Sequence, residues 1–151
     1  MSVAFRRDSD EEHLEPKFEL PLPPGPNLVT ARGLAMISAK VADLNAALAQ
    51  ATDDPTRATI NRDLRYWRAR ETTATLATIP SGDTVAFGTR VTFTLNDATR
   101  TITIVGSDEA DPAQDYITFT APLVRVLMGL SMGDAADFNG AEDAIEILRI
   151  G

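Results

Sequence analysis

The run from Ile102 to Gly133 constrains the fold more than any other stretch of the chain. Apolar β-branched residues at 102–105 predict a strand, and an acidic turn follows at 108–112. A second alternating strand at 116–120 leads into a short apolar helix that begins at Pro122, a residue suited to the first turn of a helix. A strand, an acidic turn, a strand and a helix in this order predict a sheet with a helix packed against it.

The alternating pattern continues on both sides of this run. Apolar residues alternate from Thr84 to Leu95, and Asn96-Asp97 is a hairpin-turn pair before the strand that ends at Val105. Two further strands are predicted at 135–138 and 144–150. The C-terminal half is therefore predicted to be a five-stranded sheet with one helix, which makes the whole chain α+β.

Two helices are predicted in front of the sheet. The first begins at Thr30, whose side chain can cap the first turn, and it runs to about Ala51. Its apolar seam repeats in steps of three and four at Leu34, Ile37, Val41, Leu44 and Leu48. Pro55 opens a second helix that we predict to reach about Ile79, and either Asp53 or Asp54 can cap it. So short a turn predicts an antiparallel helical hairpin, a coiled coil.

The first 27 residues contain an acidic cluster and five prolines. Proline excludes regular helix and favours extended chain, so we predict an extended, proline-rich acidic arm. The expected domains are this arm at 1–27, the helical hairpin at 28–80 and the sheet domain at 81–151.

Composition excludes several classes of function. The chain has 151 residues, no cysteine and one histidine, which excludes a disulfide framework, a thiolate metal site and a multi-histidine metal cluster. No apolar run approaches the roughly 20 residues that span a bilayer, and no apolar segment follows Arg6-Arg7 to make a secretory signal. We therefore expect a cytoplasmic protein with no membrane partner.

The charge is distributed unevenly along the chain. The total of −8 divides into −3 for the arm, +2 for the hairpin and −7 for residues 81–151. Affinity for nucleic acid rests on lysine and arginine, so the acidic C-terminal domain is predicted to bind a protein with a basic or apolar face.

Three segments of the C-terminal domain carry a resemblance to a known family. "VAFGTRVTF", "TITIVGSDEADP" and "YITFTAPLVRVLMGLSMGD" resemble the C-terminal domain of the bacterial Gre transcript-cleavage factors, the Rnk-type regulators and the Gre-like anti-cleavage factors. The resemblance implies an FKBP-like fold that binds RNA polymerase near its secondary channel. It places the binding residues in the acidic loop and around the following helix, at Asp108, Glu109, Asp111, Pro122 and Met128.

The hairpin also resembles the Gre N-terminal domain, through "VTARGLAMISAKVADLNAAL" and "YWRARE". It is several turns shorter, and the Asp-Leu-x-Glu-Asn signature of the tip is absent. Aligned on Tyr66, the two acidic positions of that signature fall at Thr59 and Arg62. Asp53 and Asp54 could replace them by sharing a Mg²⁺ with the polymerase active site, or they could only cap the second helix.

Five arginines lie on the second helix, at Arg57, Arg62, Arg65, Arg68 and Arg70. They could form a stripe for nucleic acid or the solvated face of a coiled coil. Acidic residues are interspersed among them, which favours the solvated face.

The resemblance thus implies a regulator of transcription elongation. It would insert its hairpin into the secondary channel and either stimulate cleavage of backtracked transcripts or compete with Gre factors without cleaving. It would be a monomer with no cofactor of its own and no enzymatic activity beyond assisting the polymerase, and its contact with nascent RNA would be indirect.

Two alternatives from other classes remain open. An FKBP-like fold also suggests a prolyl isomerase, which needs an aromatic pocket that could be drawn only from Phe87, Phe93, Tyr116, Phe119 and Phe138. A structural module that self-associates through the hairpin is the other.

Overall fold

The computed structural model describes residues 19–78 and 82–151. The chain divides into two compact units. The first, the hairpin unit, comprises Met1–Gly25 and Ala35–Ala74. The second, the sheet unit, comprises Pro26–Leu34 and Thr75–Gly151. Most of the arm predicted at 1–27 lies outside the described residues.

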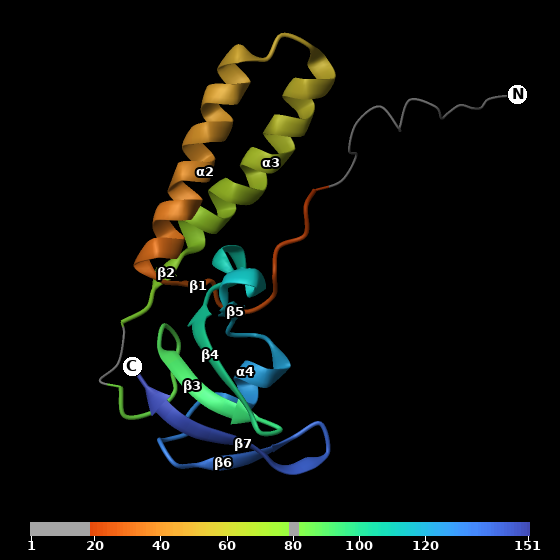
Figure 1. Ribbon diagram of the computed structural model, residues 1–151. Coiled ribbons are helices and arrows are strands. Elements are labelled where there is room, and N and C mark those ends of the chain that lie inside the picture. The colour runs from red at the N-terminus through yellow and green to blue at the C-terminus, as the bar shows by residue number, and fades with distance from the viewer. Residues whose placement is uncertain (1–18, 79–81) are drawn as a thin grey trace, which may run out of the picture. The chain divides into compact units, whose positions relative to one another are not determined.

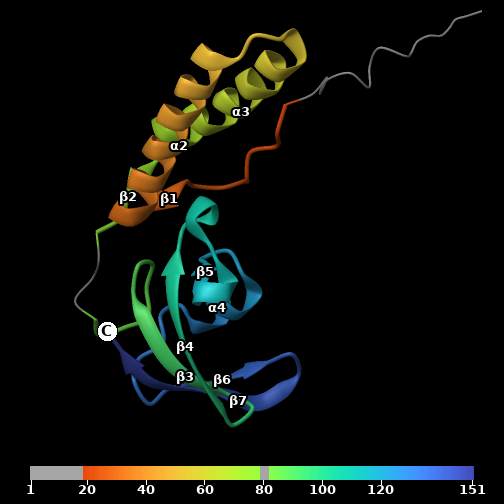
Figure 2. The same ribbon diagram turned by 45° about the horizontal axis from the view of Figure 1, so that its top comes forward.

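The hairpin unit is built from two helices, α2 (Ala31–Gln50) and α3 (Asp54–Thr73), which run antiparallel (Figures 1 and 2). The first turn of α2 belongs to the sheet unit. The predicted seam faces inward, because Ile37 and Leu64 are 1% and 0% exposed. No helix among the described residues has both the length and the apolar character that crossing a membrane requires.

The second helix is shorter than the sequence predicts. It ends at Thr73 instead of about Ile79, and Thr75–Leu76 forms strand β2. This strand pairs in parallel with β1 (Leu28–Val29). Threonine suits extended backbone better than helix, and the partner strand supplies the backbone hydrogen bonds that a helix would otherwise provide.

The pairing of β1 with β2 also shifts a boundary between the units. Pro26–Leu34 lies in the sheet unit, whereas the sequence placed it in the arm and the hairpin. The sequence pattern could not indicate this, because a two-residue strand is too short to show an alternating pattern.

The sheet unit contains a five-stranded sheet in the order β5-β4-β3-β7-β6. Its strands are β3 (Arg90–Leu95), β4 (Ala98–Val105), β5 (Tyr116–Thr118), β6 (Ala135–Phe138) and β7 (Ala141–Ile150). The strands are antiparallel except for β5, which runs parallel to β4. The five-stranded prediction is confirmed. The turn at Asn96-Asp97 is confirmed as well, with φ of 50° and 69°, as a tight hairpin turn requires.

The first strand of this sheet begins later than its pattern predicts. Residues 84–89 make an isolated bridge from Thr84 to Ser131 and then a turn, before β3 begins at Arg90. In that turn the Thr89 hydroxyl donates to the Ala86 carbonyl at 2.7 Å, and Gly88 has φ of 86°. A glycine accepts this left-handed conformation without strain, so Gly88 marks a turn.

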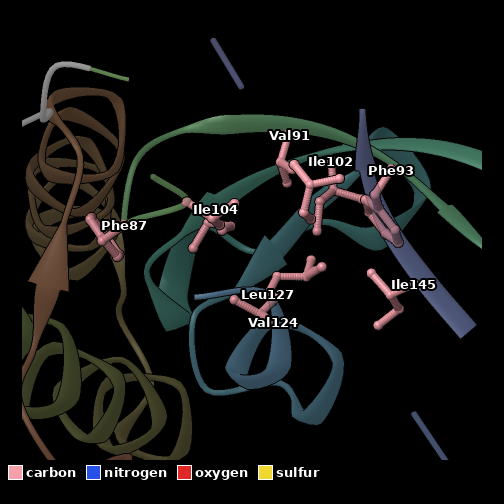
Figure 3. Packing of buried hydrophobic residues seen from close by; sticks show 10 residues of the cluster. Phe87, Val91, Phe93, Ile102, Ile104, Val124, Leu127 and Ile145 are labelled. Carbon is pink, nitrogen blue, oxygen red and sulfur yellow. The ribbon is translucent and has the colours of Figure 1, made fainter. Parts of the chain in front are cut away.

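Helix α4 (Pro122–Leu127) covers one face of the sheet. Figure 3 shows Val124 and Leu127 directed toward Ile102, Ile104 and Ile145. The core of the sheet unit is completed by Val85, Phe87, Val91, Phe93 and Ile147. The opposite face of the sheet carries threonines and arginines, among them Thr92, Thr101 and Arg149.

Replacing Phe93, which is 0% exposed, should test this core directly. Phe93→Ala should lower the free energy of unfolding by about 3–5 kcal/mol, because it removes buried contacts and leaves a cavity. Leu148→Ala, at a 40% exposed position, is the matched control and should change it by about 0.5 kcal/mol at most. Circular dichroism during urea unfolding measures both, and equal effects would contradict the assigned core.

Candidate functional site

The loop that joins β4 to β5 is the first candidate, because it carries the acidic cluster. It contains two short 3-10 turns, η2 (Ser107–Glu109) and η3 (Pro112–Gln114). Its base is closed by two backbone hydrogen bonds, from Asp111 N to Tyr116 O at 2.8 Å and from Tyr116 N to Asp111 O at 3.1 Å. The loop is therefore a defined structure with its own backbone bonds.

Glu109 is the buried member of the acidic cluster, at 3% exposure. Its carboxylate accepts hydrogen bonds from the Thr30 amide at 3.1 Å, the Thr30 hydroxyl at 2.6 Å, the Gly106 amide at 3.3 Å and Arg32 Nη1 at 3.3 Å. Four donors satisfy a charge that would otherwise be costly to bury. Glu109 thus holds the first turn of α2 within the sheet unit, where the exposed N–H groups of a helix favour a negative charge.

Two glycines make this approach possible. A Cβ at Gly33 would lie 2.2 Å from Glu109 Oε2, and a Cβ at Gly106 would lie 2.3 Å from the Leu28 carbonyl oxygen. Both distances are far below van der Waals contact. The Thr30 hydroxyl also accepts from the Gly33 amide at 3.0 Å, which confirms the predicted cap. The threonine and the glycine three residues on are therefore required by one buried carboxylate.

The other predicted binding residues lie closer to the surface. Asp108 is half-buried, Asp111 and Pro122 are exposed, and Met128 is 37% exposed. The loop holds Asp108 and Asp111, whereas Pro122 and Met128 lie at the two ends of α4. Glu109 offers a partner almost no surface, so its contribution would be to the shape of the loop.

The tip of the hairpin is the second candidate. Asp53 is the N-cap of α3, as predicted for one of the two aspartates, and Oδ2 accepts from the Thr56 hydroxyl at 2.7 Å and the Thr56 amide at 3.0 Å. The hydroxyl bond, followed by the amide bond, lowers the pKa of Asp53 below its ordinary value. Asp54 is exposed at the first position of α3. Within 19–78 and 82–151, no group of three or more acidic or histidine side chains is placed to hold a metal ion.

At the two positions where the Gre signature has acidic residues, the side chains of this chain make contacts within α3. The Thr59 hydroxyl donates to the Pro55 carbonyl at 3.1 Å, inside α3. Arg62 pairs with Asp63 at 3.1 Å. Neither side chain supplies a carboxylate at the tip.

Three further arginines of α3 have partners in the hairpin unit. Arg57 donates to the carbonyls of Leu48 and Ala51, at the end of α2, and Arg68 donates to Asn45 at 2.8 Å. Arg65 pairs with Glu19, which raises the pKa of Arg65 and lowers the pKa of Glu19. These partners argue against a stripe for nucleic acid. The solvated-face prediction is wrong for Arg70, which is buried at 5% exposure.

Comparison with known proteins identifies the sheet unit. The model of the family described as "Transcription elongation factor, GreA/GreB, C-term" matches residues 80–151. The C-terminal domain of this chain is similar to that of the GreA/GreB family. The transcription elongation factors GreA of Chelativorans sp. (strain BNC1) and of Sinorhizobium medicae (strain WSM419) are each 38% identical over 74 residues, which covers 46% of this chain and 47% of the relative. The chain thus spans about half the length of the curated relatives it matches.

The solved structures that match this chain do so with low identity and low TM-scores. The GreA factor homolog 1 (Gfh1) protein of Thermus thermophilus is 14% identical with a TM-score of 0.37, over 84% of this chain and 99% of that one. GreA/GreB from Nitrosomonas europaea is 19% identical with a TM-score of 0.39, over 82% and 97%.

Sequence reasoning missed the partners of the acidic loop. It identified Thr30 as a cap and noted the glycine three residues on, but it did not connect them with Glu109. It also missed that the Arg32 guanidinium stacks on the Tyr116 ring, 4.0 Å from the ring centroid. A glycine near the start of a helix, where alanine would stabilise, was the available signal of a close approach.

The Glu109 contacts generate a prediction about coupling between two residues. Gly33→Ala should destabilise by about 1–3 kcal/mol, because the new methyl group displaces a bonded carboxylate. Glu109→Ala should also cost about 1–3 kcal/mol, because buried N–H and O–H groups lose their acceptor. In the double variant the clash is gone and alanine favours the helix, so the loss should be smaller than the sum of the two. Urea unfolding of all four proteins measures the coupling, and strict additivity would contradict it.

The Asp53 cap generates a prediction about pH. Asp53→Ala should lower the melting temperature of the hairpin unit at neutral pH, because the first turn of α3 loses its acceptor. Because the pKa of Asp53 is lower in the folded state, the ionised carboxylate stabilises the fold at pH values above the ordinary pKa of aspartate. This stabilisation is lost as the pH falls through the pKa of the folded state. The difference from wild type should therefore shrink on acidification.

Fluorescence of Trp67 measures this effect selectively, since it is the single tryptophan and lies on α3. Asp43→Ala, at an exposed position inside α2, controls for loss of an acidic charge. A difference that stays constant down to acidic pH would exclude the carboxylate as the origin of the effect.

Proposed function

We propose that this protein is a regulator of transcription elongation that binds bacterial RNA polymerase through its sheet unit. The observation that carries the proposal is the match of residues 80–151 to the GreA/GreB C-terminal domain. The surface proposed for docking is formed by the exposed acidic loop around Asp111 and the exposed residues Pro122 and Met128 of α4. An acidic loop suits a basic partner surface, and an exposed methionine adapts to varied apolar surfaces.

The hairpin is proposed to enter the secondary channel as the Gre hairpin does. The chemistry available at its tip favours a competitor of Gre factors over a cleavage stimulator. Asp53 is occupied as a cap, and Thr59 and Arg62 stand at the acidic positions of the Gre tip. Asp54 is exposed at the tip, and it is the carboxylate proposed to assist a Mg²⁺ of the polymerase. Any phosphodiester cleavage would belong to the polymerase, so the protein would not itself be an enzyme.

Backtracked polymerase complexes with labelled transcript and Mg²⁺ test this proposal. The protein alone should leave the rate of 3′-end cleavage unchanged, and it should suppress cleavage stimulated by an authentic Gre factor. Acceleration by the protein alone would contradict the competitor. If Asp53→Asn/Asp54→Asn then abolished that acceleration, the protein would be a cleavage factor with a rebuilt tip. Asparagine caps helices as well as aspartate does, so this variant removes charge without removing the cap; Asp43→Asn is its control.

A charge reversal tests the docking surface separately. Asp111→Lys should weaken suppression of Gre-stimulated cleavage by about tenfold, as expected for loss of a charge pair with a basic partner. Glu142→Lys makes the same change at an exposed position of β7 and should have little effect. If wild type neither cleaves nor competes, the assignment to polymerase is wrong.

Prolyl isomerisation has no comparable support. Phe87 and Phe93 are 7% and 0% exposed and belong to the core, and Phe119 packs edge-on against Phe87 with ring centroids 5.5 Å apart. We therefore do not propose that activity.

A further inference from the structure

The open face of the sheet, opposite α4, carries a polar depression. Its cavity volume is about 230 Å³, and its lining residues are Arg90, Thr101, Thr103, Gln114, Asp115 and Tyr116. All six belong to the sheet unit. The docking surface proposed above includes α4, which lies on the other face of the sheet, so the depression needs a separate explanation.

Strand register brings these residues together. Arg90 of β3 lies opposite Thr103 of β4, and Thr103 in turn lies beside Tyr116 of β5. In the next row Thr92 lies between Thr101 and Arg149. The hydroxyls of Thr92 and Thr101 are 2.9 Å apart, so both point to the same face of the sheet. Three strands therefore contribute hydroxyl and guanidinium groups to one surface.

The walls of the depression are held in place. The Asp115 carbonyl accepts from the Thr103 amide at 2.9 Å, which fixes the end of the acidic loop against β4. Arg32 stacks on the Tyr116 ring and also bonds the buried Glu109 carboxylate. A fixed aromatic wall loses little conformational entropy when a ligand binds.

Arg90 is the residue of the depression that is best suited to bind a ligand. Its guanidinium has no hydrogen bond or ion pair to any residue in the described parts of the chain, and Arg149 in the neighbouring row has none there either. In a domain with a net charge of −7, two arginines without partners share one face of the sheet. Arginine presents a planar fork of donors that matches a carboxylate with two parallel hydrogen bonds.

The size and the charge of the depression limit which ligands it can bind. Small-molecule and cofactor pockets span about 300–1,000 Å³, so this depression suits one side chain of a larger partner. The Asp115 carboxylate in the lining repels a phosphate dianion more strongly than a singly charged carboxylate, and two arginines are few for a nucleic acid. We propose that the depression is a binding site for a glutamate or aspartate side chain of an acidic, extended protein segment. In this site Arg90 binds the carboxylate and the threonine hydroxyls add hydrogen bonds.

Nuclear magnetic resonance titration of the full-length ¹⁵N-labelled protein tests the site. The probe is the blocked peptide Gly-Glu-Gly-Glu-Gly, and the uncharged control is Gly-Gln-Gly-Gln-Gly. The glutamate peptide should shift the amides of Thr101, Thr103 and Tyr116, and the glutamine peptide should not. Arg90→Gln should weaken binding by about tenfold or more, because it removes a charge-assisted pair.

Arg125→Gln, on α4 and therefore on the opposite side of the sheet, removes the same charge and should leave binding unchanged. Equal shifts from both peptides, shifts confined to other residues, or no shift at millimolar peptide would each overturn the proposal. Inorganic phosphate that binds the same amides as tightly as the glutamate peptide would overturn it in favour of a phosphate site. None of these outcomes depends on RNA polymerase, so the inference stands or fails independently of the proposed function.

Discussion

The buried carboxylate of Glu109 is the constraint on which the sheet unit depends. A charge at 3% exposure is tolerated only when donors surround it, and here they come from Thr30, Arg32 and Gly106. The need to place those donors explains the capping threonine at the start of α2 and the glycines at 33 and 106. It also positions Arg32 over Tyr116, so one carboxylate orders both the first turn of α2 and a wall of the open sheet face.

The acidic residues of the loop therefore have two different roles. Glu109 turns inward and stabilises the loop, whereas Asp111 and Asp115 remain exposed on it. The sheet then separates two surfaces. One side carries α4, with the exposed residues Pro122 and Met128 that we propose as part of a docking surface. The other side carries Arg90 and Arg149 among threonines, and its chemistry suits a carboxylate.

In the hairpin unit, most charged side chains near the tip are committed to the fold. Asp53 caps α3, Arg57 bonds the end of α2, and Arg62 pairs with Asp63. These contacts stabilise a short turn between two helices, and they leave little at the tip for metal chemistry. These contacts are the reason for proposing a competitor of Gre factors and not a cleavage stimulator.

Local periodicity and turn chemistry were enough to predict part of this fold. They predicted the two helices, the α+β class, the turn at Asn96-Asp97 and the helix at Pro122, because each of these depends on neighbouring residues alone. Tertiary structure decided where distant segments meet. Helix α3 ends at Thr73 because Thr75–Leu76 pairs with Leu28–Val29. The acidic turn has the composition of a surface loop, but its Glu109 is buried because the carboxylate bonds to Thr30. The depression at Arg90 arises from the register of three neighbouring strands. The apolar pattern of one segment does not specify which residues of another strand will lie beside it.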